Sequence, residues 1–80
     1  MEHSLRRHKE QLEDLPPSAK LVAKILELEG EMTQASLAEE SLLPSRTVRY
    51  ALLRLKRRDV VSTRPSPRDA RKGLYRLTIE

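Results

Sequence analysis

The 80-residue sequence predicts one small domain of mainly α (α+β) class, with a three-helix core followed by a C-terminal two-stranded β-hairpin. Two observations lead to this prediction. Apolar residues recur at helical spacing in residues 18–29, 34–41 and 45–58, whereas residues 60–64 and 74–79 have the composition or the alternation of strands. The sequence has two Tyr and neither Phe nor Trp, so the core must be built from aliphatic side chains. A chain of this length has room for one core of modest size.

Residues 1–15 are predicted to lie outside this domain, which we expect to span residues 16–80. The first segment is charged, and it carries a stripe with the 3-4-3 spacing of a packed helix, formed by Leu5, His8, Leu12 and Leu15. An extra N-terminal helix there would pack on the domain or on its twin in a homodimer. An isolated helix of this length is marginal in water, so a solvated arm is the alternative. The sequence leaves both interpretations open.

Two prolines mark the start of the first helix of the domain. Pro16 and Pro17 end the preceding segment, and proline is tolerated in the first turn of a helix. The helix is predicted over residues 18–29, and Gly30 stands where a C-cap is expected. Its apolar residues at helical spacing are Leu21, Val22, Ile25, Leu26 and Leu28. We expect this face to be buried.

A helix-turn-helix unit is predicted next along the chain. A short link ends at Thr33, whose hydroxyl can accept from amides in the first turn of a helix over residues 34–41. Pro44 prevents extension of that helix, and Ser45 is the expected N-cap of a third helix over residues 45–58. Two helices joined by so short a turn form a helix-turn-helix unit.

A β-hairpin is predicted after the third helix. β-branched residues predict a strand over residues 60–64, and Pro65 and Pro67 then break the pattern. Residues 68–73 form a charged loop, and side chains alternate in polarity over residues 74–79, as in a second strand. A hairpin with a basic tip that follows a helix-turn-helix unit is a wing. The predicted architecture is therefore a winged helix-turn-helix domain.

Charge is distributed unevenly along the chain. The net charge is +4, but residues 1–40 contain five Lys and Arg against nine Asp and Glu, whereas residues 41–80 contain eleven against three. The basic residues of the second half are Arg46, Arg49, Arg54, Lys56, Arg57, Arg58, Arg64, Arg68, Arg71, Lys72 and Arg76. A chain polarised in this way presents one positive end to a polyanion, with nucleic acid the first candidate and an anionic membrane surface the second.

The composition argues against several classes of function. The absence of Cys excludes disulfides, thiolate zinc sites and Cys nucleophiles, and is typical of a reducing compartment. His3 and His8 are five residues apart, which is not the spacing of two ligands on one helical face, so no metal, cofactor or catalytic site is expected. No apolar run approaches a membrane span, and the N-terminus has no apolar signal segment. We expect a cytoplasmic, nucleoid-associated protein that is not an enzyme and does not bind membrane.

Three segments carry a resemblance to a known family: PPSAKLVAKILELEG, then TQASLAEESLLPSRTVRYALLRLKRRDVV (Thr33–Val61), then GLYRLT. In this order and at these separations they resemble the small MarR-like winged helix-turn-helix regulators common in archaea. The resemblance covers nearly everything from Pro16 to Thr78. It implies a transcriptional regulator that binds double-stranded DNA in a sequence-specific manner.

The sequence departs from this family at two turns. Many relatives have Gly where Leu42 and Asp59 stand. Gly suits the left-handed backbone region, in which Leu is costly. We expect either that these turns are built without a positive φ, or that burial of Leu42 offsets the strain.

The third helix is predicted to enter the major groove of DNA. With Val48 at the centre of the buried side, the core stripe at 100° per residue includes Leu52 and Leu55. The residues expected to contact DNA from this helix are Ser45, Arg46, Thr47, Arg49, Tyr50, Arg54 and Arg57. Arg can bond guanine bidentately, Tyr offers a hydroxyl to phosphate or a ring to a thymine methyl, and hydroxyls at a helix start can hold a phosphate.

Leu53 is an exception on this polar face. An apolar residue there indicates packing against the N-terminal arm, packing against a partner, or an error in the predicted rotation of the helix.

The wing is predicted to supply four further cations. Arg64, Arg68, Arg71 and Lys72 would reach the DNA backbone or the adjacent minor groove, whose narrow A/T tracts attract Arg. The alternative is a flexible, solvated loop.

A second function stays open at this point: a winged-helix docking or RNA-binding module associated with the transcription machinery. Sequence-specific RNA readers stack bases on aromatic side chains, and two tyrosines make a poor platform. A docking module would use the acidic half, the first helix over residues 18–29 or Leu53, and would not need an Arg-lined third helix.

Overall fold

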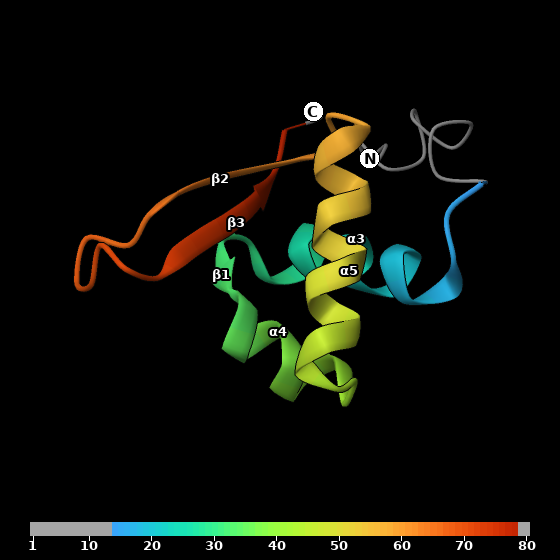
Figure 1. The fold of residues 1–80 in the computed structure, drawn as a ribbon, viewed down its shortest axis with the longest axis horizontal. Coiled ribbons are helices and arrows are strands. Elements are labelled where there is room, and N and C mark those ends of the chain that lie inside the picture. Colours follow the sequence, from blue (N-terminus) through green and yellow to red (C-terminus); the bar gives the residue numbers. More distant parts are fainter. Residues whose placement is uncertain (1–13, 79–80) are drawn as a thin grey trace.

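The computed structural model describes residues 14–78. Figure 1 shows α5 (Ser45–Arg57) crossing in front of α3 (Pro17–Glu29), with the two helices in contact and a β-hairpin extended to one side. The predictions for residues 1–13 lie outside the described residues. Leu15, the last residue of the predicted N-terminal stripe, is buried in the core.

The ends of α3 follow the prediction from sequence. Pro17 is its first residue, and the carbonyl of Pro16 accepts from the amides of Ala19 at 3.0 Å and Lys20 at 3.2 Å. At the other end Gly30 adopts a φ of 84°, and its amide donates to the carbonyl of Leu26 at 2.9 Å. Proline at the start and glycine at the end thus confine the helix to one place.

The buried face of α3 differs in part from the predicted one. The prediction was correct for Val22 and Leu26 but wrong for Leu21 and Leu28, which are exposed. The buried residues are Ala19, Val22, Ala23 and Leu26. Small side chains at a helix–helix contact let the backbones approach closely, and α3 packs directly on α5.

The helix-turn-helix unit begins at a strand that the sequence analysis interpreted as a link. β1 (Met32–Thr33) pairs with β3 (Gly73–Leu77), with Met32 opposite Tyr75. The next helix, α4 (Gln34–Ser41), has the predicted bounds, and the Thr33 hydroxyl accepts from the Ser36 amide at 3.1 Å. Thr33 is therefore the N-cap, as predicted.

The hairpin of β2 (Val61–Pro65) and β3 is antiparallel, as predicted, and its register runs from Val61 opposite Leu77 to Pro65 opposite Gly73. With β1 it forms a three-stranded sheet in the order β1-β3-β2, one strand more than predicted. Pro65 lacks an amide hydrogen, which is tolerated because it ends an edge strand.

The rotation of α5 about its axis agrees with the prediction. The buried residues of this helix are Val48, Ala51, Leu52 and Leu55. The expected cap is wrong: Ser45 is the first helical residue, and the carbonyl of Pro44 accepts from the amides of Thr47 at 2.9 Å and Val48 at 3.1 Å.

The core lies between the three helices and the base of the wing. Its buried members are all Leu, Val and Ala, and no polar or charged residue among residues 14–78 belongs to it. None of the described helices is long and apolar enough to cross a membrane. Within the same residues, no cluster of three His, Asp or Glu side chains is arranged to hold a metal ion.

Both turns that depart from the family have a positive φ, contrary to the two expectations from sequence. Leu42 has a φ of 62° and is 89% exposed, so burial does not offset its strain. Asp59 has a φ of 59°, which Asp tolerates better than most residues, and its carbonyl accepts from the Thr78 hydroxyl.

The strain at Leu42 leads to a stability prediction. Leu42→Gly is expected to raise the free energy of unfolding by about 1 kcal/mol, because the left-handed conformation penalises a Cβ atom and the exposed side chain contributes little burial. Urea denaturation followed by circular dichroism measures the change. Leu42→Ala, which keeps the Cβ atom, is the control and should differ little from the parent chain. A less stable glycine variant would show that the leucine side chain makes contacts that stabilise the fold.

Candidate nucleic-acid interface

The outward side of α5 is an open, cationic surface. Arg46, Arg49, Arg54 and Arg57 are exposed, and none of them forms an ion pair with another residue in the described range 14–78. Tyr50 is 65% exposed on the same side. The predicted contact residues of the helix are therefore accessible, apart from Thr47, which is half-buried beside the core.

Side chains on this surface fall into three rows along α5. At 100° per residue, the row farthest from the buried stripe contains Arg46, Tyr50, Leu53 and Arg57. Arg49 lies on the side that faces the wing, where it lines a hollow of about 110 Å³ together with Lys56 and Tyr75. Arg54 lies on the opposite flank. Only the outermost row and the row on the wing side are placed to approach a ligand that also touches the wing.

The start of α5 is fixed by a contact that the sequence analysis missed. The side-chain amide of Gln34, at the start of α4, donates to the Ser45 hydroxyl at 3.1 Å and to the Ser45 carbonyl at 3.3 Å. Ser45 is exposed and borders a hollow of about 370 Å³ that Arg71 and Lys72 of the wing also line. The first turn of α5 and the root of the wing tip thus face the same space.

The tip of the wing, residues 66–72, is ordered by short-range hydrogen bonds. The Asp69 carboxylate accepts from the Arg71 amide at 3.0 Å and from the Arg71 side chain at 3.3 Å. These bonds, the backbone bond first, lower the pKa of Asp69 below its ordinary value despite partial burial, and the Lys72 charge adds to the effect. Arg68, Arg71 and Lys72 all remain exposed at the tip.

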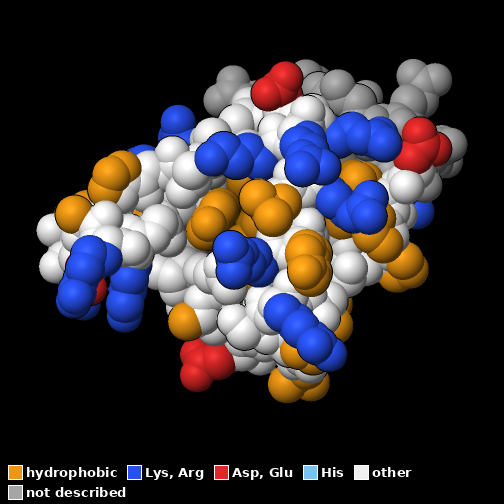
Figure 2. Space-filling model, viewed as in Figure 1, with side chains coloured by type: hydrophobic (Ala, Val, Ile, Leu, Met, Phe, Trp, Pro, Cys, Tyr) orange, Lys and Arg blue, Asp and Glu red, His pale blue; other side chains and the backbone are white. Residues whose placement is uncertain are grey.

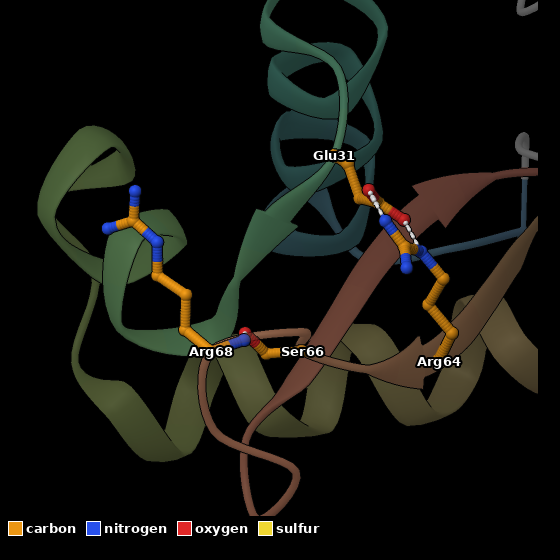
Figure 3. A network of polar contacts seen from close by, with 4 residues as sticks. All are labelled: Glu31, Arg64, Ser66 and Arg68. Carbon is orange, nitrogen blue, oxygen red and sulfur yellow. Dashed lines mark hydrogen bonds and ion pairs between the residues drawn. The ribbon is translucent and has the colours of Figure 1, made fainter.

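Arg64 is placed differently from the other predicted wing residues. Its guanidinium forms a bidentate pair with Glu31, at 2.6 Å and 2.7 Å, across 33 positions of sequence. Figure 3 shows this side chain turned back towards Glu31, whereas Arg68 extends away from the pair, with its amide bonded to the Ser66 hydroxyl. The ion pair connects the wing to the segment between α3 and β1. Because the charge of Arg64 is paired with Glu31, it is not available to another partner.

Glu31 and Arg64 shift each other's pKa. Hydrogen bonds from Arg64 lower the pKa of the Glu31 carboxyl, partial burial opposes this, and the charges of Arg64 and Arg76 lower it further. The same hydrogen bonds and the Glu31 charge raise the pKa of Arg64. Because the folded pKa of Glu31 is depressed, the pair stabilises the fold above the ordinary value of 4.5, and this contribution is lost as the pH falls through the folded pKa.

The lowered pKa of Glu31 leads to a prediction about how stability depends on pH. Glu31→Gln is expected to lower the thermal unfolding midpoint at pH 7, and the difference from the parent chain is expected to shrink as the pH is lowered from 7 towards 2 and the parent carboxyl takes up its proton. Glu29→Gln is the control, since Glu29 is exposed and forms no ion pair within residues 14–78. An equal difference at both ends of this pH range would mean that Glu31 stabilises the fold by something other than its charge.

The charge on the α5 side of the molecule is predominantly positive. Figure 2 shows Lys and Arg side chains spread over the α5 face and gathered at the end of the wing, with acidic side chains few and mostly at the edges. Hydrophobic side chains occupy the middle of the face, between the cations.

Comparisons with known proteins give a uniform result at the level of structure. No protein-family model matches the sequence, and no curated protein sequence matches it either. Among solved structures, the PcaV transcriptional regulator from Streptomyces coelicolor in complex with its natural ligand is similar at a TM-score of 0.77 and 26% identity, over 92% of this chain. The chain has the winged-helix fold of MarR-type transcriptional regulators.

Two further structures share this MarR-type fold. The transcriptional regulator PA4135 is 29% identical over 94% of the chain, with a TM-score of 0.74. BpsR from Bordetella bronchiseptica, whose DNA binding is regulated by 6-hydroxynicotinic acid, is 25% identical over 94%, with a TM-score of 0.74. The chain spans 52% to 61% of the length of these three proteins. The archaeal part of the resemblance stays a prediction.

Proposed function

We propose that this MarR-type winged helix binds double-stranded DNA in a sequence-specific manner as a transcriptional regulator, and is not an enzyme. In this proposal α5 enters the major groove and the tip of the wing contacts the backbone or the adjacent minor groove. The observation that carries the proposal is the set of exposed cations on α5 that form no ion pair within residues 14–78, with the start of the helix and the wing tip bordering one hollow. Solved proteins of the same fold that are regulators support it.

Each group of residues has a distinct role in this proposal. Arg46 and Arg49, in the first turns of α5, contact base edges, since the N-terminal part of a recognition helix lies deepest in the groove. Ser45 contacts a phosphate at the helix start, and Thr47 supports that turn from its half-buried position. Arg54 and Arg57 contact the flanking backbone. In the wing, Arg68, Arg71 and Lys72 contact phosphates, and Arg64 positions the wing through Glu31.

Binding measured in two salt concentrations tests the proposal. Duplexes selected from a random pool, and random duplexes of equal length, are titrated with the full chain in 50 mM and 200 mM salt. About six phosphate contacts predict a loss of affinity of about 10³-fold between the two conditions, because each neutralised phosphate releases counterions. Selected duplexes are expected to bind more tightly than random ones. The absence of duplex binding at 50 mM salt would refute the regulator proposal.

The wing provides a second, narrower test. Arg71→Ala is expected to weaken binding to all duplexes alike and to reduce the slope of log affinity against log salt by about one, since it removes one phosphate contact. Lys20→Ala, an exposed cation on α3, is the matched control and should leave the slope unchanged. An unchanged slope for Arg71→Ala would show that the wing tip does not touch the backbone.

RNA binding and protein docking are the two alternatives to this function, and either would show in the same titration as a failure to bind duplex DNA. An RNA reader needs exposed rings on which bases stack, and of the two tyrosines only Tyr50 is exposed, whereas Tyr75 is half-buried. A single-stranded RNA that competes with every duplex would reverse the assignment.

Homodimerisation through the N-terminal segment belongs to the proposal as well. A symmetric dimer would place its two α5 helices about 34 Å apart and would bind a palindromic site. Sedimentation of the chain with and without residues 1–13 tests this; Leu15 is retained because it is buried in the core. If both chains sediment as monomers, the N-terminal segment does not mediate dimerisation.

A further inference from the structure

Leu53 is an apolar side chain in the middle of a cationic surface. It is 45% exposed, while its helix neighbours Leu52 and Leu55 are buried, so its position does not come from an error in the predicted rotation of α5. Arg49 precedes it by one turn and Arg57 follows it by one turn. The core of the domain therefore does not explain why a leucine stands here.

Tyr50 extends the apolar character of this position. Tyr50 and Leu53 are three residues apart on the outermost row of α5, about 4.5 Å along the helix axis, with Arg46 and Arg57 at the two ends of the row. We call the pair Tyr50 and Leu53 the apolar ridge. Figure 2 shows hydrophobic side chains of this face bordered by Lys and Arg on several sides.

The ridge also borders a recess of the surface. Leu53 lines the hollow of about 110 Å³ between α5 and the wing, together with Arg49, Lys56 and Tyr75. Its lining therefore combines the apolar side chains of Leu52 and Leu53 with two cations and with the polar groups of Gln34 and Tyr75. A small apolar group attached to a polyanion fits this combination better than an apolar protein surface, which would have to bury the charges of Arg49 and Lys56 without partners.

We propose that the apolar ridge recognises thymine C5-methyl groups in the major groove, and that Leu53 is a specificity-determining residue. The inference rests on the proposed function and names what this part of the site distinguishes. The thymine methyl is the apolar group that B-DNA presents along its major-groove edge, where the other groups are hydrogen-bond donors and acceptors. The cations around the ridge hold the phosphates and guanines, while Tyr50 and Leu53 select thymine beside them.

Deoxyuridine scanning tests the inference. A duplex selected by the full chain is resynthesised with each thymine replaced singly by deoxyuridine, which removes only the methyl group. At one or two positions the affinity of the parent chain is expected to fall about fourfold, the effect of removing one buried methyl-sized group from contact. Leu53→Ala is expected to bind thymine and uracil duplexes equally at the position that Leu53 contacts, with the affinity of the parent chain for uracil.

An exposed leucine elsewhere in the chain provides the control for this experiment. Leu28→Ala removes an exposed leucine from α3 and should keep the full sensitivity to uracil. Circular dichroism verifies that both variants are folded, as expected for exposed positions. Duplex binding without any sensitivity to uracil, or with the same sensitivity in Leu53→Ala, would overturn the inference and leave the regulator proposal intact. A Leu53→Ala variant that changes sedimentation but not methyl sensitivity would assign Leu53 to a second copy of the chain. No binding to any duplex would refute both.

Discussion

Replacing Leu55 with alanine is expected to lower the free energy of unfolding by about 2–5 kcal/mol, the largest effect of any substitution considered for this domain. Leu55 has no exposed surface, and it packs in a core that consists of Leu, Val and Ala side chains. None of its fully buried side chains is aromatic, and aliphatic neighbours in a closely packed core fill a vacated space only in part, so much of the cavity will persist. Against a total stability of about 5–15 kcal/mol for a small domain, this loss is severe.

A comparison with Leu53 lets the same experiment test which side of α5 is exposed at the proposed interface. Leu53→Ala, two positions earlier on the same helix, removes the same atoms from a side chain that is nearly half exposed, and is expected to cost less than about 1 kcal/mol. Urea denaturation of both variants measures the two losses. Equal losses would mean that α5 is rotated about its axis relative to the structure, and that Arg46, Arg49 and Tyr50 do not share an open face.

Local signals along the chain predicted the helix-turn-helix unit closely. Gly30 ended α3, the Thr33 hydroxyl capped α4, and the period of apolar residues fixed the rotation of α5 around Val48. Each of these features depends on residues within one or two turns of each other, so a single sequence contains the information. The accessibility of the predicted α5 contacts follows from the same rotation.

Features that depend on distant residues could not be predicted in this way. β1 has only two residues and exists because Met32 and Thr33 pair with β3, more than 40 positions later. The bond of Arg64 to Glu31 likewise spans 33 positions, and a basic residue in a wing gives no sign of it. On α3, both alanines and leucines have helical spacing, and only the packing of α3 against α5, α4 and β3 decides that Ala19 and Ala23 are buried while Leu28 is not.

The contact between α4 and α5 is an intermediate case. Gln34 is the first residue of α4, and Ser45 is the first residue of α5, so a side chain able to donate two hydrogen bonds stands at the crossing of the two helix starts. The sequence contains this signal, but an interpretation of Ser45 as an N-cap obscured it. The cap itself is supplied by the backbone of Pro44.

Arg49→Ala is expected to weaken binding to the selected duplex by about 5- to 150-fold, which corresponds to the roughly 1–3 kcal/mol of one bidentate contact with guanine. Arg49 is exposed in the second turn of α5, has no ion-pair partner among residues 14–78, and faces the wing. Binding to random duplexes is expected to fall only a fewfold, because that binding depends on the number of phosphate contacts rather than on base edges. The ratio of the two affinities measures the effect.

Arg54→Ala is the matched control for this prediction, since it removes the same charge from the same helix on the flank away from the wing. It is expected to weaken selected and random duplexes alike, as the loss of a phosphate contact does. If Arg49→Ala behaves in the same way as Arg54→Ala, then Arg49 is a backbone contact, and the specificity must come from Arg46 and the apolar ridge. If Arg54→Ala weakens both kinds of duplex alike and only Arg49→Ala reduces selectivity, α5 lies in the groove with its wing-facing side against the bases.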